Sequence, residues 1–250
     1  MLLLFDIGNT SVTYGVYQGN RSLKFGSCLY NDIPKLVKNW SRSGVFKNDF
    51  NIVIGSVVPK NTLFLKKILS KKGGKTWTVG KNLPIPVPHR YSSKRKLGID
   101  RIINIYGGLQ MVKPPFLIID YGTAITFDYV SKKGVFEGGM IVPGPEVAFQ
   151  ALIERAALLP KKLRLPKKSG SFLGRTTYDC MSSGIFEGYG AMTDGLVARF
   201  RNRYGKNLRV IATGGFAMHL KPYAASLKRV DPRHSIKSLF LLFKNEGKGL

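Results

Sequence analysis

The pattern of hydrophobic and polar positions at the start of the chain predicts a buried strand, a tight turn and a second strand. The apolar run at 2–5 leads into Asp6, Gly8 and Thr10 follow, and from Val12 onward apolar residues alternate with small or polar ones. A glycine turn lets backbone N–H groups approach a phosphate, and Asp6 is placed to hold a Mg²⁺ that bridges phosphate oxygens. An ordinary hairpin with a polar turn also fits this stretch, so both interpretations stay open here.

Residues 116–130 repeat this pattern about half a chain later. An apolar run ends in Asp120, Gly122 and Thr123 follow, and a second alternating strand comes next. Two such units predict two related domains that face each other across a cleft and each supply one turn to a polyphosphate. The arrangement is similar to that of the sugar kinase, Hsp70 and actin superfamily, in which a strand leading into a double glycine, here within 210–217, lies against the adenosine.

The rest of the chain alternates between strand-like and helix-like patterns, which predicts an α/β fold. Further strands are predicted at 22–30, 51–59 and 76–79, and helices at 33–40, 61–69, 99–113, 146–157, 176–204 and 219–227. The helix-breaking run Lys113-Pro114-Pro115 predicts a domain boundary. We therefore expect an N-terminal domain at 1–113 and a C-terminal domain at 114–250.

The helix predicted near 99–113 begins with a candidate functional carboxylate. In the run Leu97-Gly98-Ile99-Asp100-Arg101, the last two residues lie at the N-terminus of the helix. The free N–H groups and the positive dipole end favour an ionised carboxylate at that position. Capping of the helix by Asp100 is the alternative to a functional role.

Composition narrows the class of protein. The chain has 250 residues and 44% hydrophobic content, enough for two modest domains with cores. No apolar run reaches the roughly 18 residues that span a bilayer, and the N-terminus lacks the features of a signal peptide, so we expect a cytoplasmic protein with no membrane association. Cys28 and Cys180 are expected to be buried free thiols, and the scattered histidines are not expected to bind metal.

The charge is strongly positive. Forty Lys and Arg residues against 14 acidic ones give a net charge of +26. Basic runs occur at 66–75, 94–96 and 161–168, but none matches a nucleic-acid recognition motif. Such a surface attracts anions such as ATP, so we expect only non-specific binding of nucleic acid.

With these segments assembled, the chain resembles the type III pantothenate kinase family from Met1 to about Ala217. The motifs that carry the resemblance are DIGNT (6–10), LGIDR (97–101), DYGTA (120–124), EGGMIVPG (137–144), the stretch 174–188 and TGGFA (213–217). The resemblance implies an actin-like ATPase fold, with two duplicated ribonuclease H-like α/β domains around a cleft. It also implies a homodimer that uses ATP, Mg²⁺ and a monovalent cation, K⁺ or NH₄⁺, to phosphorylate pantothenate to 4′-phosphopantothenate, the first step of coenzyme A biosynthesis.

The resemblance also implies site residues. The ATP-binding residues would be Asp6, Ile7, Gly8, Asn9, Thr10, Ser11, Val12, Thr13 and Thr123. The pantothenate-binding residues would be Gly98, Ile99, Asp100, Arg101 and Thr177. Asp100 matches the proton acceptor, Asp120 the ligand of the monovalent cation, and Asp6 an indirect Mg²⁺ contact. Two departures concern pantothenate contact: Thr176 replaces the family's usual Asn, and the basic run 94–96 replaces a proline.

Two alternatives remain at the level of sequence. The same family includes the Bvg accessory factor, a transcriptional regulator, and the positive charge suits contact with nucleic acid. The joint presence of Asp6, Asp100 and Asp120 favours a working kinase over that regulator. A sugar kinase of the same fold is the other alternative, and the LGIDR motif favours pantothenate over a sugar.

Within 176–204, small residues four apart allow close helix contact, either inside the fold or across a dimer.

Overall fold

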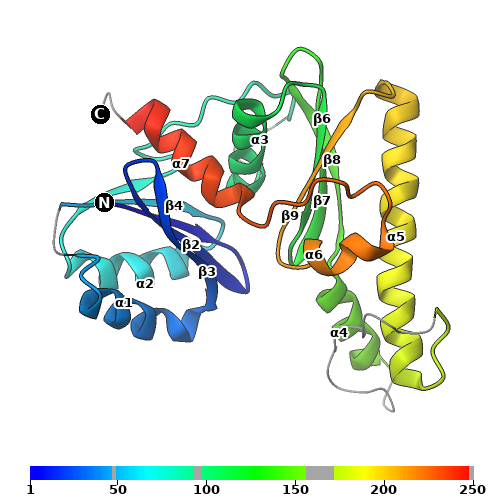
Figure 1. The fold of residues 1–250 in the computed structure, drawn as a ribbon, viewed down its shortest axis with the longest axis horizontal. Helices are drawn as coiled ribbons and strands as arrows, with labels where there is room; N and C mark the ends of the chain where they lie inside the picture. The colour runs from blue at the N-terminus through cyan, green and yellow to red at the C-terminus, as the bar shows by residue number, and fades with distance from the viewer. Residues whose placement is uncertain (47–48, 93–96, 156–171, 248–250) are drawn as a thin grey trace. The chain divides into compact units, whose positions relative to one another are not determined.

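The computed structural model of the chain describes residues 1–46, 49–92, 97–155 and 172–247 (Figure 1). The chain forms two compact units, one made of Met1–Met111 with Arg233–Leu250 and the other of Val112–Pro232. This division differs from the expected domains in that the last segment of the chain returns to the first unit. The return is made by a C-terminal helix, α7 (His234–Glu246), which packs against a helix and the sheet of that unit.

The sheet of the first unit has the strand order β3-β2-β1-β4-β5. Its strands are β1 (Leu2–Ile7), β2 (Ser11–Gln18), β3 (Arg21–Leu29), β4 (Asn51–Ser56) and β5 (Lys75–Thr78). β1 pairs antiparallel with β2 and parallel with β4. The strand, turn and strand predicted at the N-terminus are therefore confirmed.

Helices pack on both faces of this sheet. Besides α7 they are α1 (Ile33–Arg42), α2 (Pro59–Ser70) and α3 (Ile99–Met111), and a 3₁₀ turn at Tyr30–Asp32 precedes α1. Alternation along β1 directs Phe5 and Ile7 to one face, where they form a core with Trp40 of α1 and Leu65 of α2. α7 packs against α3 and against β1, β2 and β4.

The sheet of the second unit repeats the first in order and direction. It runs β8-β7-β6-β9, with β6 (Phe116–Tyr121), β7 (Ala124–Val130), β8 (Phe136–Pro143) and β9 (Arg209–Thr213). β6 pairs antiparallel with β7 and parallel with β9, as β1 does with β2 and β4. A parallel bridge between Ala212 and Val230 lies where β5 lies in the first unit. The predicted duplication is therefore present in the topology.

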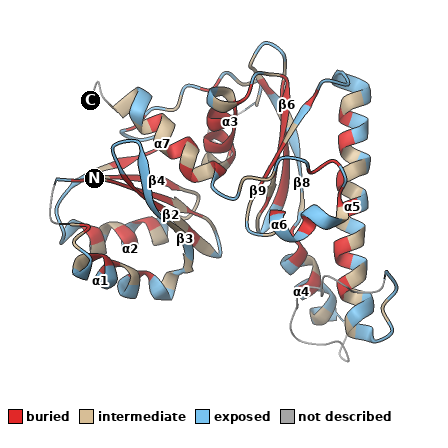
Figure 2. Cartoon of the chain, in the orientation of Figure 1, coloured by how far each residue is buried: buried red, intermediate tan, exposed pale blue. Residues whose placement is uncertain are grey.

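The helices of the second unit are α4 (Pro145–Arg155), α5 (Thr177–Tyr204) and α6 (Ala217–Leu220), followed by a 3₁₀ turn at Lys221–Tyr223. The core of this unit joins Phe127 and Tyr129 of β7 to Phe186 and Phe200 of α5. Figure 2 shows buried positions along one face of α5 and exposed positions along the other. The 28-residue helix is therefore anchored to the sheet by one stripe.

The structure differs from the sequence-based expectations at several positions, and some expected features lie outside the described residues. The helix expected at 219–227 ends at Leu220, because Pro222 has no N–H to continue it. The carboxylate of Asp194 instead accepts from the N–H groups of Ala225 and Ser226, at 2.9 and 2.8 Å. Both cysteines are free as expected, but neither is buried: Cys28 is partly exposed and Cys180 is exposed. The basic runs 94–96 and 161–168 lie outside the described residues. No helix in the described part of the chain is long and apolar enough to cross a membrane.

Candidate active site

The turn at residues 8–10, which was expected to bind phosphate and is called the first phosphate turn below, joins β1 to β2. Asp6 is the penultimate residue of β1 and pairs with Thr13, and the N–H of Gly8 donates to the carbonyl oxygen of Ser11 at 3.1 Å. Asn9 and Thr10 lie exposed at the tip. Ile7 and Val12, also predicted to contact ATP, are buried in the core, so only their backbone groups are placed to do so.

The glycine in this turn is not required by the fold. Gly8 does not adopt a left-handed φ, and a Cβ built on it would lie 3.5 Å from the carbonyl oxygen of Ser11, an ordinary contact. A side chain at this position would therefore project into the space beside the turn. Close approach of a ligand to the backbone is the physical reason that remains for a glycine here.

We therefore expect Gly8→Ala to leave the melting temperature unchanged and to raise the KM for ATP. A methyl group would hold phosphate oxygens away from the turn, and a loss of about tenfold corresponds to ~1.4 kcal/mol of binding. Thermal unfolding and steady-state kinetics test this together. A fall in melting temperature with an unchanged KM would mean that the glycine serves the fold instead.

Tyr30, at the start of the 3₁₀ turn before α1, supports the phosphate turn from behind. Its hydroxyl donates to the carbonyl oxygen of Gly8 and lies 3.5 Å from that of Ser11. Burial raises the pKa of this hydroxyl, so it remains a donor at neutral pH. Nothing in the sequence pointed to Tyr30, because a single tyrosine after a strand carries no pattern that links it to a turn 22 residues earlier.

The carboxylate of Asp6 lies in an enclosed, charged environment. Burial raises the pKa of Asp6 to about 6, a hydrogen bond from the Ser235 side chain opposes that rise, and the negative charge of Asp100 adds to it. Asp6 and Asp100 belong to the same unit, and the negative charge of one acts on the other. No group of three or more His, Cys, Asp or Glu in the described ranges could hold a metal by protein ligands alone.

This pair of carboxylates suits Mg²⁺ in an ATP site. Mg²⁺ prefers oxygen ligands and is usually bound through one or two carboxylates, with water and substrate phosphates completing its shell. A divalent cation would relieve the repulsion between Asp6 and Asp100 that the structure contains. The side chains present therefore fit the cation that the sequence analysis expected.

Asp100 lies in the first turn of α3, as predicted. The helix begins at Ile99, so Asp100 is its second residue rather than its cap, and Oδ1 accepts from the N–H of Arg101 at 2.8 Å. A Cβ on Gly98 would overlap Oδ1, so this carboxylate position requires the glycine. The motif thus fixes one carboxylate oxygen and leaves Oδ2 for another partner.

Arg101 is buried next to Asp100. It is 6% exposed, and its guanidinium lies 5.6 Å from the centre of the Tyr91 ring. A cation over an aromatic face is stabilised by the charge distribution of the ring. Arg101 therefore has a fixed position beside the carboxylate of the LGIDR motif.

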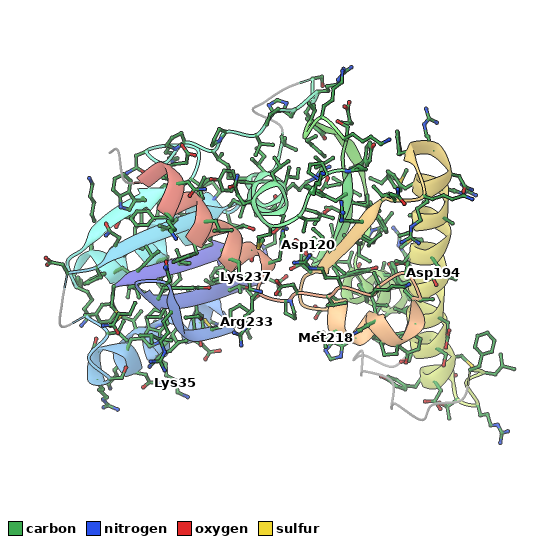
Figure 3. All side chains as sticks on the ribbon, turned by 45° about the horizontal axis from the view of Figure 1, so that its top comes forward. Lys35, Asp120, Asp194, Met218, Arg233 and Lys237 are labelled. Carbon is green, nitrogen blue, oxygen red and sulfur yellow. The ribbon has the colours of Figure 1, made fainter. Side chains whose placement is uncertain are left out.

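In the second unit, separate sequence motifs meet around Asp120. This residue is penultimate in β6, as Asp6 is in β1, and Figure 3 marks its position. Gly214, with φ of +94°, lies against Asp120. A Cβ on Gly214 would overlap Oδ1 of Asp120 and would lie 2.6 Å from the backbone nitrogen of Tyr121. The double-glycine turn predicted from the sequence therefore packs against the second aspartate.

The EGGMIVPG motif supports the second phosphate turn. The N–H of Gly144 donates to the carbonyl oxygen of Thr123 at 2.9 Å, and a Cβ on Gly144 would overlap the carbonyl oxygen of Gly122. Thr123 itself is exposed in the turn between β6 and β7. Its side chain is therefore accessible, as an ATP contact requires.

Thr176 is the N-cap of α5. Its hydroxyl accepts from the N–H of Asp179 at 3.1 Å and lies 2.8 Å from the carboxylate of the same residue. Asn and Thr are both preferred at this position. The departure from the family's usual Asn therefore keeps the cap, and Thr177, the expected pantothenate contact, is the exposed first residue of the helix.

Thr176→Ala should destabilise the second unit by about 1 kcal/mol, the usual contribution of an N-cap side chain. That corresponds to a fall in melting temperature of about 2–4 °C for a chain of this size. Thr176→Asn should melt like the parent, because asparagine caps as well as threonine. Equal losses in both variants would show that the hydroxyl does more than cap the helix.

The sequence of the chain is similar to those of known kinases. A model of the type III pantothenate kinase family matches residues 2–199. The type III pantothenate kinase of Geotalea uraniireducens (strain Rf4) is 33% identical over 98% of this chain and 98% of its own length.

Solved structures share the fold. A conserved Campylobacter jejuni protein assigned to the Baf family of transcriptional activators has a TM-score of 0.59 and 21% identity, over 99% of this chain and 100% of that one. MreB5 of Spiroplasma citri, bound to ADP, has a TM-score of 0.51 and 11% identity, over 99% of this chain and 97% of that one. The actin-like ATPase fold predicted from the sequence is confirmed.

Proposed function

The chain belongs to the type III pantothenate kinase family, and we propose that it phosphorylates pantothenate with ATP, giving 4′-phosphopantothenate for coenzyme A biosynthesis. The observation that supports the proposal most is that the first unit contains both Asp6, at the end of β1 beside the glycine turn, and Asp100, in the first turn of α3. One unit thus contains both a phosphate-binding turn and a carboxylate with a free oxygen. Kinase relatives match over nearly the whole chain, so the regulator alternative is not favoured.

In this proposal Asp100 is the general base. Its Oδ2 accepts the proton of the primary hydroxyl of pantothenate as that oxygen attacks the γ-phosphorus, and ADP leaves on the opposite side. The N–H of Arg101 holds Oδ1 and so orients the carboxylate. Phosphoryl transfer depends mainly on positioning and charge neutralisation, which suits a site built from backbone turns and fixed carboxylates.

Two cations are also part of the proposal. Mg²⁺ would neutralise the charge of the triphosphate, and Asp6 would hold it indirectly. Asp120 would bind K⁺ or NH₄⁺, and Thr123 would contact ATP. The support for these roles is the matching position of the two aspartates at the ends of β1 and β6. Gly98, Ile99 and Thr177 remain the expected pantothenate contacts.

The homodimer that the family resemblance implies is also part of the proposal. The small residues that lie four apart on α5 are all exposed, and a Cβ on Gly184, Gly188 or Gly195 would meet nothing within 4 Å among the described residues. These positions are therefore not used for close packing inside the described fold. Light scattering coupled to size-exclusion chromatography measures the oligomeric state directly.

The test of the proposed activity is an assay of ADP release with a panel of acceptors. Pantothenate should support turnover in the presence of Mg²⁺, whereas glucose, N-acetylglucosamine and other small sugars should not. Turnover with a sugar and none with pantothenate would favour the sugar kinase alternative. Absence of turnover with every acceptor, together with sequence-specific binding of a DNA duplex, would favour the regulator.

A further inference from the structure

The peptide group between Pro143 and Gly144, at the end of the EGGMIVPG motif, is hydrogen-bonded at both of its ends. Its N–H, which belongs to Gly144, donates to the carbonyl oxygen of Thr123 in the second phosphate turn at 2.9 Å. Its carbonyl oxygen, which belongs to Pro143, accepts from the hydroxyl of Tyr189 on α5 at 2.6 Å. Because a peptide group is planar, a bond that orients its C=O also orients its N–H. Tyr189 is therefore connected to the second phosphate turn through one rigid group.

The second phosphate turn rests directly on this peptide group. A Cβ on Gly144 would overlap the carbonyl oxygen of Gly122 and would lie 2.6 Å from that of Thr123, so no side chain fits between the two backbones. Gly144 is buried, whereas Thr123 is exposed. A rotation of the peptide group that joins Pro143 to Gly144 would therefore displace the turn that carries Thr123.

Tyr189 is held in a fixed position by its helix. A Cβ on the next residue, Gly190, would overlap the carbonyl oxygen of Tyr223, so α5 lies directly against the 3₁₀ turn that follows α6. One turn further along α5, the hydroxyl of Thr193 lies 2.8 Å from that of Tyr121, the last residue of β6. Burial raises the pKa of Tyr189, so its hydroxyl stays protonated at neutral pH. The hydroxyl is therefore a donor whose place is set by the packing of α5.

We propose that Tyr189 is a positioning residue of the nucleotide site: its hydroxyl orients the peptide group that joins Pro143 to Gly144, and that group holds the second phosphate turn in the shape that receives ATP. The proposal rests on the function proposed above, in which Thr123 contacts ATP. It also gives the EGGMIVPG motif a role, as the link between α5 and the turn. No local pattern signals Tyr189, because its hydrogen bond spans 46 residues of the chain.

The physical argument separates orientation from stability. Pro143 is exposed, so water can hydrogen-bond its carbonyl oxygen when the hydroxyl is removed, and the free energy of unfolding should change little. A water molecule is not anchored to α5, however, and does not fix the plane of the peptide group. The hydrogen bond from Gly144 to Thr123 also loses the strengthening that neighbouring hydrogen bonds give each other. Removal of the hydroxyl should therefore weaken the binding of ATP more than it weakens the fold.

The test compares two tyrosine-to-phenylalanine variants on the same helix. Tyr189→Phe should raise the KM for ATP by about fivefold, the size expected for one hydrogen bond between neutral groups, and should keep the melting temperature within about 2 °C. The KM for pantothenate should stay within about twofold, because its expected contacts lie in the LGIDR motif and at the start of α5. Tyr204→Phe is the matched control: its ring stacks on that of Tyr129 with 4.1 Å between centres, at the end of β7 away from the turn, so the KM for ATP should not change.

Amide hydrogen exchange, followed by NMR, reports on the turn without substrate. The N–H of Gly144 should exchange several-fold faster in Tyr189→Phe than in the parent, and at the parent's rate in Tyr204→Phe. If Tyr189→Phe does not fold, Tyr189→Met offers an adaptable apolar side chain without a strong donor, and the same changes are expected. A lower melting temperature with an unchanged KM for ATP, an equal rise in KM in Tyr204→Phe, or failure of both Tyr189 variants to fold would overturn the proposal.

An equilibrium titration with ATP and Mg²⁺ keeps this result separate from the proposed activity. If the parent binds ATP but does not phosphorylate pantothenate, the proposed function fails while the Tyr189 comparison can still be made from dissociation constants. An affinity for ATP about fivefold weaker in Tyr189→Phe would then support the positioning role, and equal affinities would refute it.

Discussion

Asp100→Asn is expected to lower kcat by about 10²–10⁴-fold, the usual contribution of general base catalysis. The amide has nearly the shape of the carboxylate but cannot take the proton of the attacking hydroxyl. Its Oδ1 can still accept from the N–H of Arg101, so the first turn of α3 should persist. ATP should therefore bind this variant about as well as it binds the parent.

The control for this variant is Asp32→Asn, which also removes a carboxylate at the start of a helix. Asp32 is exposed next to α1, and its side chain makes no capping hydrogen bond there. Its replacement should leave kcat unchanged. A loss of less than tenfold in Asp100→Asn across the pH range would show that another group takes the proton.

Asp6→Asn is expected to slow the Mg²⁺-dependent reaction and, at the same time, to stabilise the metal-free fold. Burial raises the pKa of Asp6 from 3.8 to about 6, so at neutral pH the folded chain carries an anion that its surroundings disfavour. At ~1.36 kcal/mol per pKa unit, a neutral amide would remove a penalty of up to about 3 kcal/mol. Residues that serve a metal or a ligand often cost stability in this way.

The pH dependence gives the sign of this effect. Between pH values of about 4 and 6 the folded state keeps a proton on Asp6 that the unfolded state loses, so the stability of the parent falls as the pH rises. Above the raised pKa of about 6 the penalty is complete. Asp6→Asn lacks this dependence, so its advantage in melting temperature without metal should be largest near neutral pH and should disappear near pH 4.

Two measurements check this prediction. Melting temperatures without metal, recorded from pH 4 to 8, test the electrostatic part, and a constant difference across that range would contradict it. The dependence of kcat/KM on Mg²⁺ concentration tests the functional part, because Asp6→Asn should need more Mg²⁺ to reach half of its maximal rate. A Mg²⁺ dependence equal to that of the parent would remove Asp6 from the metal site.

The parts of the fold that could be predicted are those encoded locally. The two aspartates at strand ends, each followed by a glycine turn and an alternating strand, predict the β1–β2 and β6–β7 hairpins, because apolar runs and turns act through near neighbours. The LGIDR motif likewise predicts the start of α3 with Asp100 in its first turn. In both cases, the residues that define the element lie within it.

The parts that could not be predicted depend on contacts between distant segments. Tyr30 reaches the first phosphate turn from the 3₁₀ turn that follows β3, and it belongs to no local pattern that signals such a contact. The helix expected at 219–227 was wrong for a related reason. Its end is determined by Pro222 and by the carboxylate of Asp194, which lies on another helix.

Mass spectrometry of pantothenate recovered after incubation with the protein, ATP and Mg²⁺ tests the central claim most directly. The account predicts that pantothenate gains the mass of a single phosphate, in step with the ADP formed, and that the Asp100→Asn protein leaves pantothenate essentially unchanged over the same time. Consumption of ATP with no change in the mass of pantothenate would contradict the account.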